Sequence, residues 1–172
     1  MKIVELYSYK DGQKFVEKHF APELEDIRLA LAGVTEKGHR SPTGNGRLLP
    51  GALRRTLKQR FIDQGWDRQR VKVEMLHAPK RAVYRELDFV KNRLGVDVQF
   101  GKVALMSYNV VTKMPIFRNE DLIDAGALIV PMKDLAAEMS SGVAYFEQLV
   151  WDLEHRGVAD VEIPALVLGV AM

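Results

Sequence analysis

Apolar and polar residues alternate with two different periods along the chain, and the period indicates which segments form helices and which form strands. The helical period occurs over residues 11–20, 23–32, 50–64, 132–139 and 143–155, and strand-like patterns occur over residues 2–8, 71–76, 83–90, 94–100, 102–111, 127–130 and 161–170. This order predicts an α/β fold in which helices flank a mixed central β-sheet, with the functional site at one edge of the sheet. No repeat or linker divides the chain, so we expect residues 1–172 to form one domain.

Polar side chains interrupt the two central strand patterns in a regular way. Asp88 ends one alternation, the chain turns over residues 91–95, and a second alternation carries Asp97 and Gln99. Residues two apart in a strand share a face, so Asp97 and Gln99 are expected to project together from an exposed hairpin face, with Asp88 beside them. Two carboxylates and an amide oxygen suit Mg²⁺ and favour metal-assisted phosphodiester hydrolysis. Taken alone, the pattern fits ordinary solvent-facing side chains better.

Composition narrows the function classes. The 172 residues contain no cysteine, which excludes a disulfide scaffold, a thiolate zinc site and a cysteine nucleophile. No run of eighteen apolar residues predicts a membrane span, and the N-terminal residues lack the apolar stretch of a signal peptide. A cytoplasmic location is therefore the default expectation. The net charge of +2 is too small to indicate nucleic-acid binding by itself.

The distribution of charge is more informative than its sum. Residues 37–80 contain eleven lysines and arginines against three acidic residues. Arg54, Arg55 and Lys58 lie on one side of the helix predicted from Pro50, where they could contact DNA phosphates. The alternative, that these charges only solvate an outward helix face, is equally open at this point.

The hairpin resembles the active-site motif of the PD-(D/E)xK nucleases, and within that superfamily the BglII branch, in which glutamine replaces the motif lysine. That branch reads Asp-Phe, a short turn, then Glu-Val-Gln-Phe, and this chain reads Asp88-Phe89, the turn, then Asp97-Val98-Gln99-Phe100. The similarity extends to residues 2–8, 65–66, 100–102, 131–133, 138–142 and 164–168, and so covers most of the chain. Asp97 departs from the pattern, because it stands where the branch has the longer glutamate.

The resemblance implies a restriction-endonuclease-like fold and the activity of a type II restriction endonuclease. Its target would be a short palindrome in double-stranded DNA, with a GATC core, cut to leave 5′ overhangs. Asp88 and Asp97 would hold Mg²⁺, with the backbone carbonyl of Val98 as a further ligand. Gln99 would orient the attacking water by hydrogen bonds.

The resemblance also suggests how DNA is read. The loop containing Ser140 and Ser141 would approach base edges in the major groove, although Ser-Ser-Gly alone indicates only a helix break. Lys102 would reach a phosphate or, equally, remain a solvated lysine at a strand end. A palindromic target implies a homodimer in which each subunit cuts one strand.

Two other functions are compatible with these residues. A DNA repair or recombination nuclease would use the same metal site with little sequence specificity. A non-catalytic descendant, conceivable because of Asp97, would bind a palindrome and leave it uncut.

Overall fold

The computed structural model describes residues 1–43, 46–73, 83–102, 106–155 and 163–172. Six strands form one mixed sheet in the order β1-β6-β5-β4-β3-β2, in which β4, β5 and β6 are parallel and the other pairs antiparallel. The strands are β1 Lys2–Tyr9, β2 Asp67–Val73, β3 Val83–Lys91, β4 Leu94–Val98, β5 Ala125–Pro131 and β6 Ala165–Ala171. The helices are α1 Gly12–His19, α2 Ala21–Ala32, α3 Pro50–Asp63, α4 Met106–Tyr108, the π-helix η2 Asn109–Lys113, α5 Met114–Asn119, α6 Lys133–Met139 and α7 Phe146–His155.

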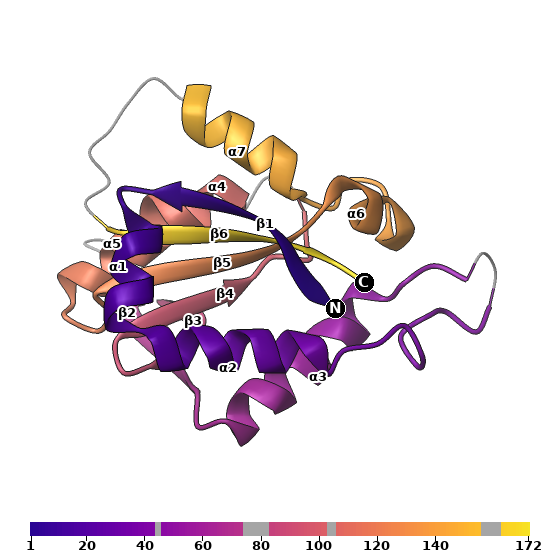
Figure 1. Cartoon of the computed structure of the whole chain (residues 1–172), viewed down its shortest axis with the longest axis horizontal. Coiled ribbons are helices and arrows are strands. Elements are labelled where there is room, and N and C mark those ends of the chain that lie inside the picture. The colour runs from indigo at the N-terminus through magenta and orange to yellow at the C-terminus, as the bar shows by residue number, and fades with distance from the viewer. Residues whose placement is uncertain (44–45, 74–82, 103–105, 156–162) are drawn as a thin grey trace.

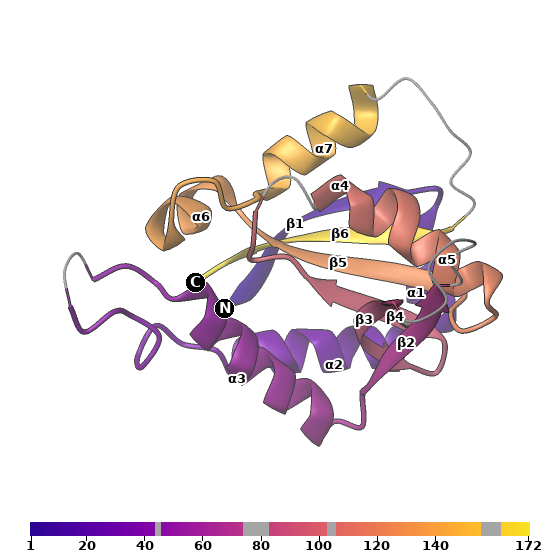
Figure 2. The ribbon, with the colours of Figure 1, turned by 180° about the vertical axis from the view of Figure 1, so that it is seen from behind.

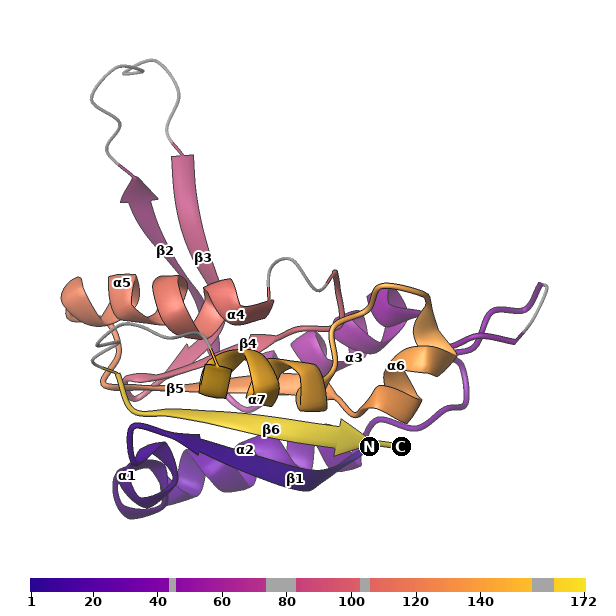
Figure 3. The same ribbon diagram turned by 90° about the horizontal axis from the view of Figure 1, so that it is seen from above.

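Helices cover both faces of the sheet, as the α/β prediction requires. The views in Figures 1 and 2 place α2 and α3 on one side of the sheet and α7 on the other. Side chains of α1, α2, α3 and α6 share one buried cluster with Val96 and Val98, whereas η2, α5 and α7 pack in a second cluster with Leu128. Seen from above, β2 and β3 project beyond the body of the molecule (Figure 3). Within the described segments, every helix is too short or too polar to cross a lipid bilayer.

Helix α3 packs its apolar side on the sheet and carries its basic residues on a neighbouring side, which lines a cleft with Asp88. Leu53, Leu57 and Phe61 repeat every fourth residue, and all three are fully buried. Pro50 occupies the first turn, where its missing amide costs nothing. Gly65 follows the helix with a φ of 80°, a conformation that glycine adopts without strain. The helix predicted over residues 50–64 is thus confirmed.

The central hairpin forms as the alternation predicts. Lys91 pairs with Leu94, so the turn contains only Asn92 and Arg93, both at positive φ as a tight hairpin requires. The Arg93 guanidinium donates to Asp124 at 2.7 Å and to Asp121 at 2.6 Å, which fixes the turn against the loop before β5. The turn between the strands that carry Asp88 and Asp97 is therefore fixed in place by Arg93.

One predicted strand is wrong. Residues 106–111, which belong to the strand predicted over 102–111, are helical, while residues 103–105 lie outside the described residues. Val110, Met114 and Phe117 are fully buried at spacings of four and three, which is a helical period. Burial of this apolar side decides the conformation here, because β propensity is a weak preference that packing overrides.

The remaining elements agree with the sequence patterns to within a few residues. The predicted strands at 2–8, 83–90, 94–100 and 127–130 and the helices at 11–20, 23–32 and 132–139 are confirmed, and the last helix begins at Phe146. The strands predicted at 71–76 and 161–170 are confirmed as far as residues 71–73 and 165–170; residues 74–76 and 161–162 lie outside the described residues.

Candidate active site

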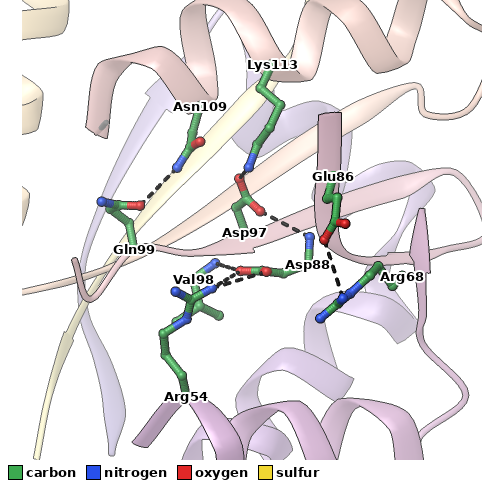
Figure 4. A network of polar contacts seen from close by, with 9 residues as sticks. All are labelled: Arg54, Arg68, Glu86, Asp88, Asp97, Val98, Gln99, Asn109 and Lys113. Atoms are coloured by element: carbon green, nitrogen blue, oxygen red, sulfur yellow. Dashed lines mark hydrogen bonds and ion pairs between the residues drawn. The ribbon is translucent and has the colours of Figure 1, made fainter. Parts of the chain in front are cut away.

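The carboxylates of Asp88 and Asp97 interlock across the β3–β4 hairpin. The backbone amide of Asp88 donates to Oδ1 of Asp97 at 3.1 Å, and the backbone amide of Val98 donates to Oδ2 of Asp88 at 3.1 Å (Figure 4). Each carboxylate thus accepts a hydrogen bond from the strand that bears the other. The two acidic groups stand side by side because Phe89 pairs with Val96 in the antiparallel register. The convergence that the sequence predicts is present.

The expectation that these residues lie on an exposed hairpin face is wrong for Asp97, whose residue surface is 2 % exposed. The helix η2 covers this face of β4, so the strand is buried on both sides. Burial raises the pKa of Asp97 to about 6; the Lys113 ammonium opposes this rise and the Asp88 carboxylate adds to it. Asp88 is more open, with 25 % of its side chain exposed. The site also lies between two inner strands, not at a sheet edge.

A cation from a different helix pairs with each carboxylate. Arg54 of α3 donates from Nη2 to Oδ1 and Oδ2 of Asp88 at 3.2 and 3.1 Å. Lys113, the last residue of η2, forms an ion pair with Oδ2 of Asp97. The two acids are therefore neutralised from opposite sides of the sheet, by α3 on one face and η2 on the other (Figure 4).

Gln99 faces the same cleft as Asp97, as its position two residues along the strand predicts, and it is also buried. Its Oε1 accepts a hydrogen bond from Asn109 of η2 at 3.2 Å, and its Nε2 donates to the backbone carbonyl of Lys102 at 3.1 Å. The orientation of the amide is therefore fixed. Lys102 contributes its backbone to this contact, and its side chain is exposed.

The basic residues singled out on α3 adjoin the acidic pair. Arg54, Arg55 and Lys58 line a cleft together with Asp88, and this cleft meets the one around Asp97 and Gln99 at Arg54 and Asp88. Among the described residues, no carboxylate pairs with Arg55 or Lys58. The structure thus brings the predicted phosphate-contacting residues to the predicted acidic site.

The serine loop is tied to the end of the site strand. Ser140 and Ser141 are exposed directly after α6. Beyond them, Val143 forms a β-bridge with Lys102, and the amide of Ala144 donates to the carbonyl of Gly101 at 2.9 Å. The loop predicted to approach bases therefore lies next to the segment that follows Gln99.

Glu86 lies two residues before Asp88 on β3, and its ion-pair partners are on β2. Its carboxylate pairs with Arg70 at 2.7 Å and Arg68 at 3.4 Å. These contacts join two neighbouring strands, so Glu86 has a structural role in the hairpin.

The residues present fit a magnesium ion by their chemistry. Asp88 and Asp97 offer carboxylate oxygens and Val98 a backbone carbonyl, all hard ligands. The described residues contain no cluster of three or more histidine, cysteine or acidic side chains able to hold a metal. A site with only two carboxylates suits Mg²⁺, which keeps several waters and takes further ligands from phosphate.

Sequence reasoning missed Asn109 and Lys113, the two η2 residues that contact the site. The wrong strand assignment over 102–111 concealed them, because it placed this segment within the sheet, whereas the helix η2 lies across the face of β4. The buried spacing of Val110, Met114 and Phe117 was the available signal. A residue four positions from another lies on the same side of such a helix, as Asn109 and Lys113 do.

A mixed sheet with paired carboxylates on a central hairpin and a basic helix beside them is the arrangement of a restriction endonuclease. The restriction endonuclease BglII/BglIII family matches residues 4–170, and the chain belongs to that family. It is thus a type II site-specific endonuclease, a DNA-cutting hydrolase of a restriction system.

Solved structures agree with this assignment. The structure of BglII complexed with a DNA 16-mer matches all of this chain and 79 % of its own, with a TM-score of 0.72 and 18 % sequence identity. The structure of free BglII matches all of this chain and 80 % of its own, with a TM-score of 0.68 and 17 % identity. At these identities the likeness establishes the fold. No curated protein sequence matches the chain.

Proposed function

We propose that this endonuclease cuts both strands of a short palindrome with a GATC core in the presence of Mg²⁺, leaves 5′ overhangs and acts as a homodimer in the cytoplasm. The observation that carries the catalytic part is the interlocked pair Asp88 and Asp97, held at 3.1 Å by reciprocal backbone bonds beside a basic cleft. The target sequence, the overhang and the dimer rest on the resemblance of the hairpin and serine loop to the BglII branch.

Some groups of the site bind the metal, and Gln99 orients the attacking water. Asp88, Asp97 and the Val98 carbonyl hold the metal, which when bound polarises the phosphate and activates water. Gln99 keeps one lone pair and one N–H beyond its contacts with Asn109 and Lys102, and these orient the attacking water.

DNA binding is assigned to two surfaces. Arg54, Arg55 and Lys58 contact backbone phosphates and position the duplex over the acidic pair. Ser140 and Ser141 contact base edges in the major groove and supply sequence discrimination. Lys102, exposed between the loop and the site, contacts a phosphate. A two-fold symmetric dimer brings one such site to each strand of a palindrome.

Sequencing of fragment ends tests this proposal. Unmethylated genomic DNA is digested with the purified protein in Mg²⁺, and every fragment end is sequenced. The proposal predicts ends at one palindrome containing GATC, each with a 5′ overhang. Scattered ends would indicate a nuclease of repair or recombination type, and DNA that is bound but uncut in both Mg²⁺ and Mn²⁺ would indicate a non-catalytic protein.

A further inference from the structure

Lys113 is the one basic side chain of η2 that reaches the acidic pair. It forms an ion pair with Asp97 Oδ2, and only 13 % of the Lys113 side chain is exposed. A lysine rarely gives up this much hydration unless a charged partner compensates. The contact places a largely buried positive charge in the cleft that Asp88, Asp97 and Gln99 line.

The helix and strand present their polar residues in matching order. Asp97 and Gln99 are two apart on β4, about 6.6 Å along a strand. Lys113 and Asn109 are four apart on η2, one turn along a helix, and they meet Asp97 and Gln99 respectively. These two polar contacts, made in the same order along η2 and β4, show that η2 packs on the site through its polar residues. A π-helix is itself uncommon and often marks a functional site.

Because Gln99 is neutral, a positive charge at this site has to come from outside the strand that carries Gln99. The motif that this hairpin resembles carries lysine where this chain has the neutral Gln99, so the strand supplies no positive charge. The charge that develops on a phosphate under attack is stabilised by a cation positioned beforehand. Lys113 contacts Asp97, two residues before Gln99 in the chain, and it lines the same cleft as Gln99.

We propose that Lys113 is a catalytic cation of this enzyme: its ammonium pairs with Asp97 in the DNA-free protein and binds the scissile phosphate when DNA enters the cleft. The inference rests on the proposed function of the Asp88–Asp97 site. In the free protein Lys113 competes with a divalent cation for Asp97, and in the DNA complex it stabilises the phosphate. Loss of its charge therefore affects metal binding and cleavage in opposite directions.

The variant Lys113→Gln tests this, because its amide still donates to Asp97 and preserves the fold. Calorimetry with Ca²⁺ alone at pH 8.5, without DNA, is expected to show affinity raised about fivefold or more. Single-turnover cleavage in saturating Mg²⁺ is expected to fall about 10²- to 10³-fold. Lys113→Arg should restore most of the cleavage, and Lys18→Met, which removes an exposed lysine of α1, should change neither quantity.

Three outcomes would overturn the inference. If Lys113→Gln lowers Ca²⁺ affinity along with cleavage, Lys113 only positions Asp97. If cleavage stays at the wild-type rate, Lys113 does not contact the phosphate. If Lys113→Arg is as slow as Lys113→Gln, charge is not the property required. Failure of the proposed function is separate, because it would appear as a wild-type enzyme that does not cut or as Asp88→Asn cutting normally.

Discussion

Oδ1 of Asp97 accepts a hydrogen bond from the backbone amide of Asp88 at 3.1 Å. The buried carboxylate of Asp97 is therefore held by the backbone of Asp88, whose own carboxylate is more exposed. Asp88 in turn is held by the strand of Asp97, through the Val98 amide. The two candidate ligands are therefore not interchangeable. Asp97 is buried against Lys113, whereas Asp88 is partly open and pairs with the exposed Arg54.

This difference predicts unequal stability losses. Lys113→Met leaves the Asp97 carboxylate buried without its cation, and we expect the free energy of unfolding to fall by roughly 2–4 kcal/mol. Asp88→Asn can keep its bond from the Val98 amide and should lose less than about 1 kcal/mol. Urea unfolding at pH 7 measures both. The double variant Asp97→Asn with Lys113→Met should recover much of the loss; equal losses for the two single variants would contradict the assigned burial.

A pH dependence follows from the raised pKa of Asp97. The unfolded carboxyl ionises near pH 4 and the folded one near pH 6, so the folded state binds more protons between these values. The contribution of Asp97 is then fully present below pH 4 and is lost as pH rises through 6, by at most about 3 kcal/mol. Urea unfolding of wild type and Asp97→Asn at pH 4, 5, 6 and 7 should show a stability difference that changes across this window. A constant difference would mean that Asp97 is not perturbed.

The basic cleft predicts a change in salt dependence. Neutralising Arg55 or Lys58 should weaken binding to cognate and random DNA alike, and should flatten the slope of log affinity against log salt by roughly 0.9 for each phosphate that the variant no longer neutralises. Arg54→Ala should act similarly, with an additional effect on Asp88, its partner. Lys18→Ala on α1 is the matched control. Slopes equal to wild type for all three variants would place α3 away from DNA.

The serine loop predicts a loss of discrimination. If Ser141 contacts a base edge, Ser141→Ala should reduce the preference for cognate over single-mismatch DNA by about 1–3 kcal/mol. Binding to random DNA should stay unchanged, since phosphate contacts are intact. Competition binding in Ca²⁺ with a set of mismatched duplexes provides the measurement. Unchanged preference in the double variant Ser140→Ala with Ser141→Ala would remove the loop from base reading.

The sequence predicted the hairpin and its acidic residues because their causes are local. Alternation assigns Asp97 and Gln99 to one face, and a two-residue turn brings Asp88 alongside. The helix that covers this face, η2, packs there through contacts between residues distant in the sequence, which local patterns do not reveal. Residues 106–111 look strand-like in isolation and are helical because Val110 and Met114 pack on the sheet. Asp97 was therefore expected in solvent, and Asn109 and Lys113 were not foreseen.

Single-turnover cleavage by Asp88→Asn tests the central claim most directly. This variant is expected to fold, because its effect on stability is small, and to bind palindromic DNA in Ca²⁺. In saturating Mg²⁺ its cleavage rate should fall at least about 10³-fold below wild type, the equivalent of about 4 kcal/mol of transition-state stabilisation. Cleavage at the wild-type rate would show that the Asp88–Asp97 pair is not the active site.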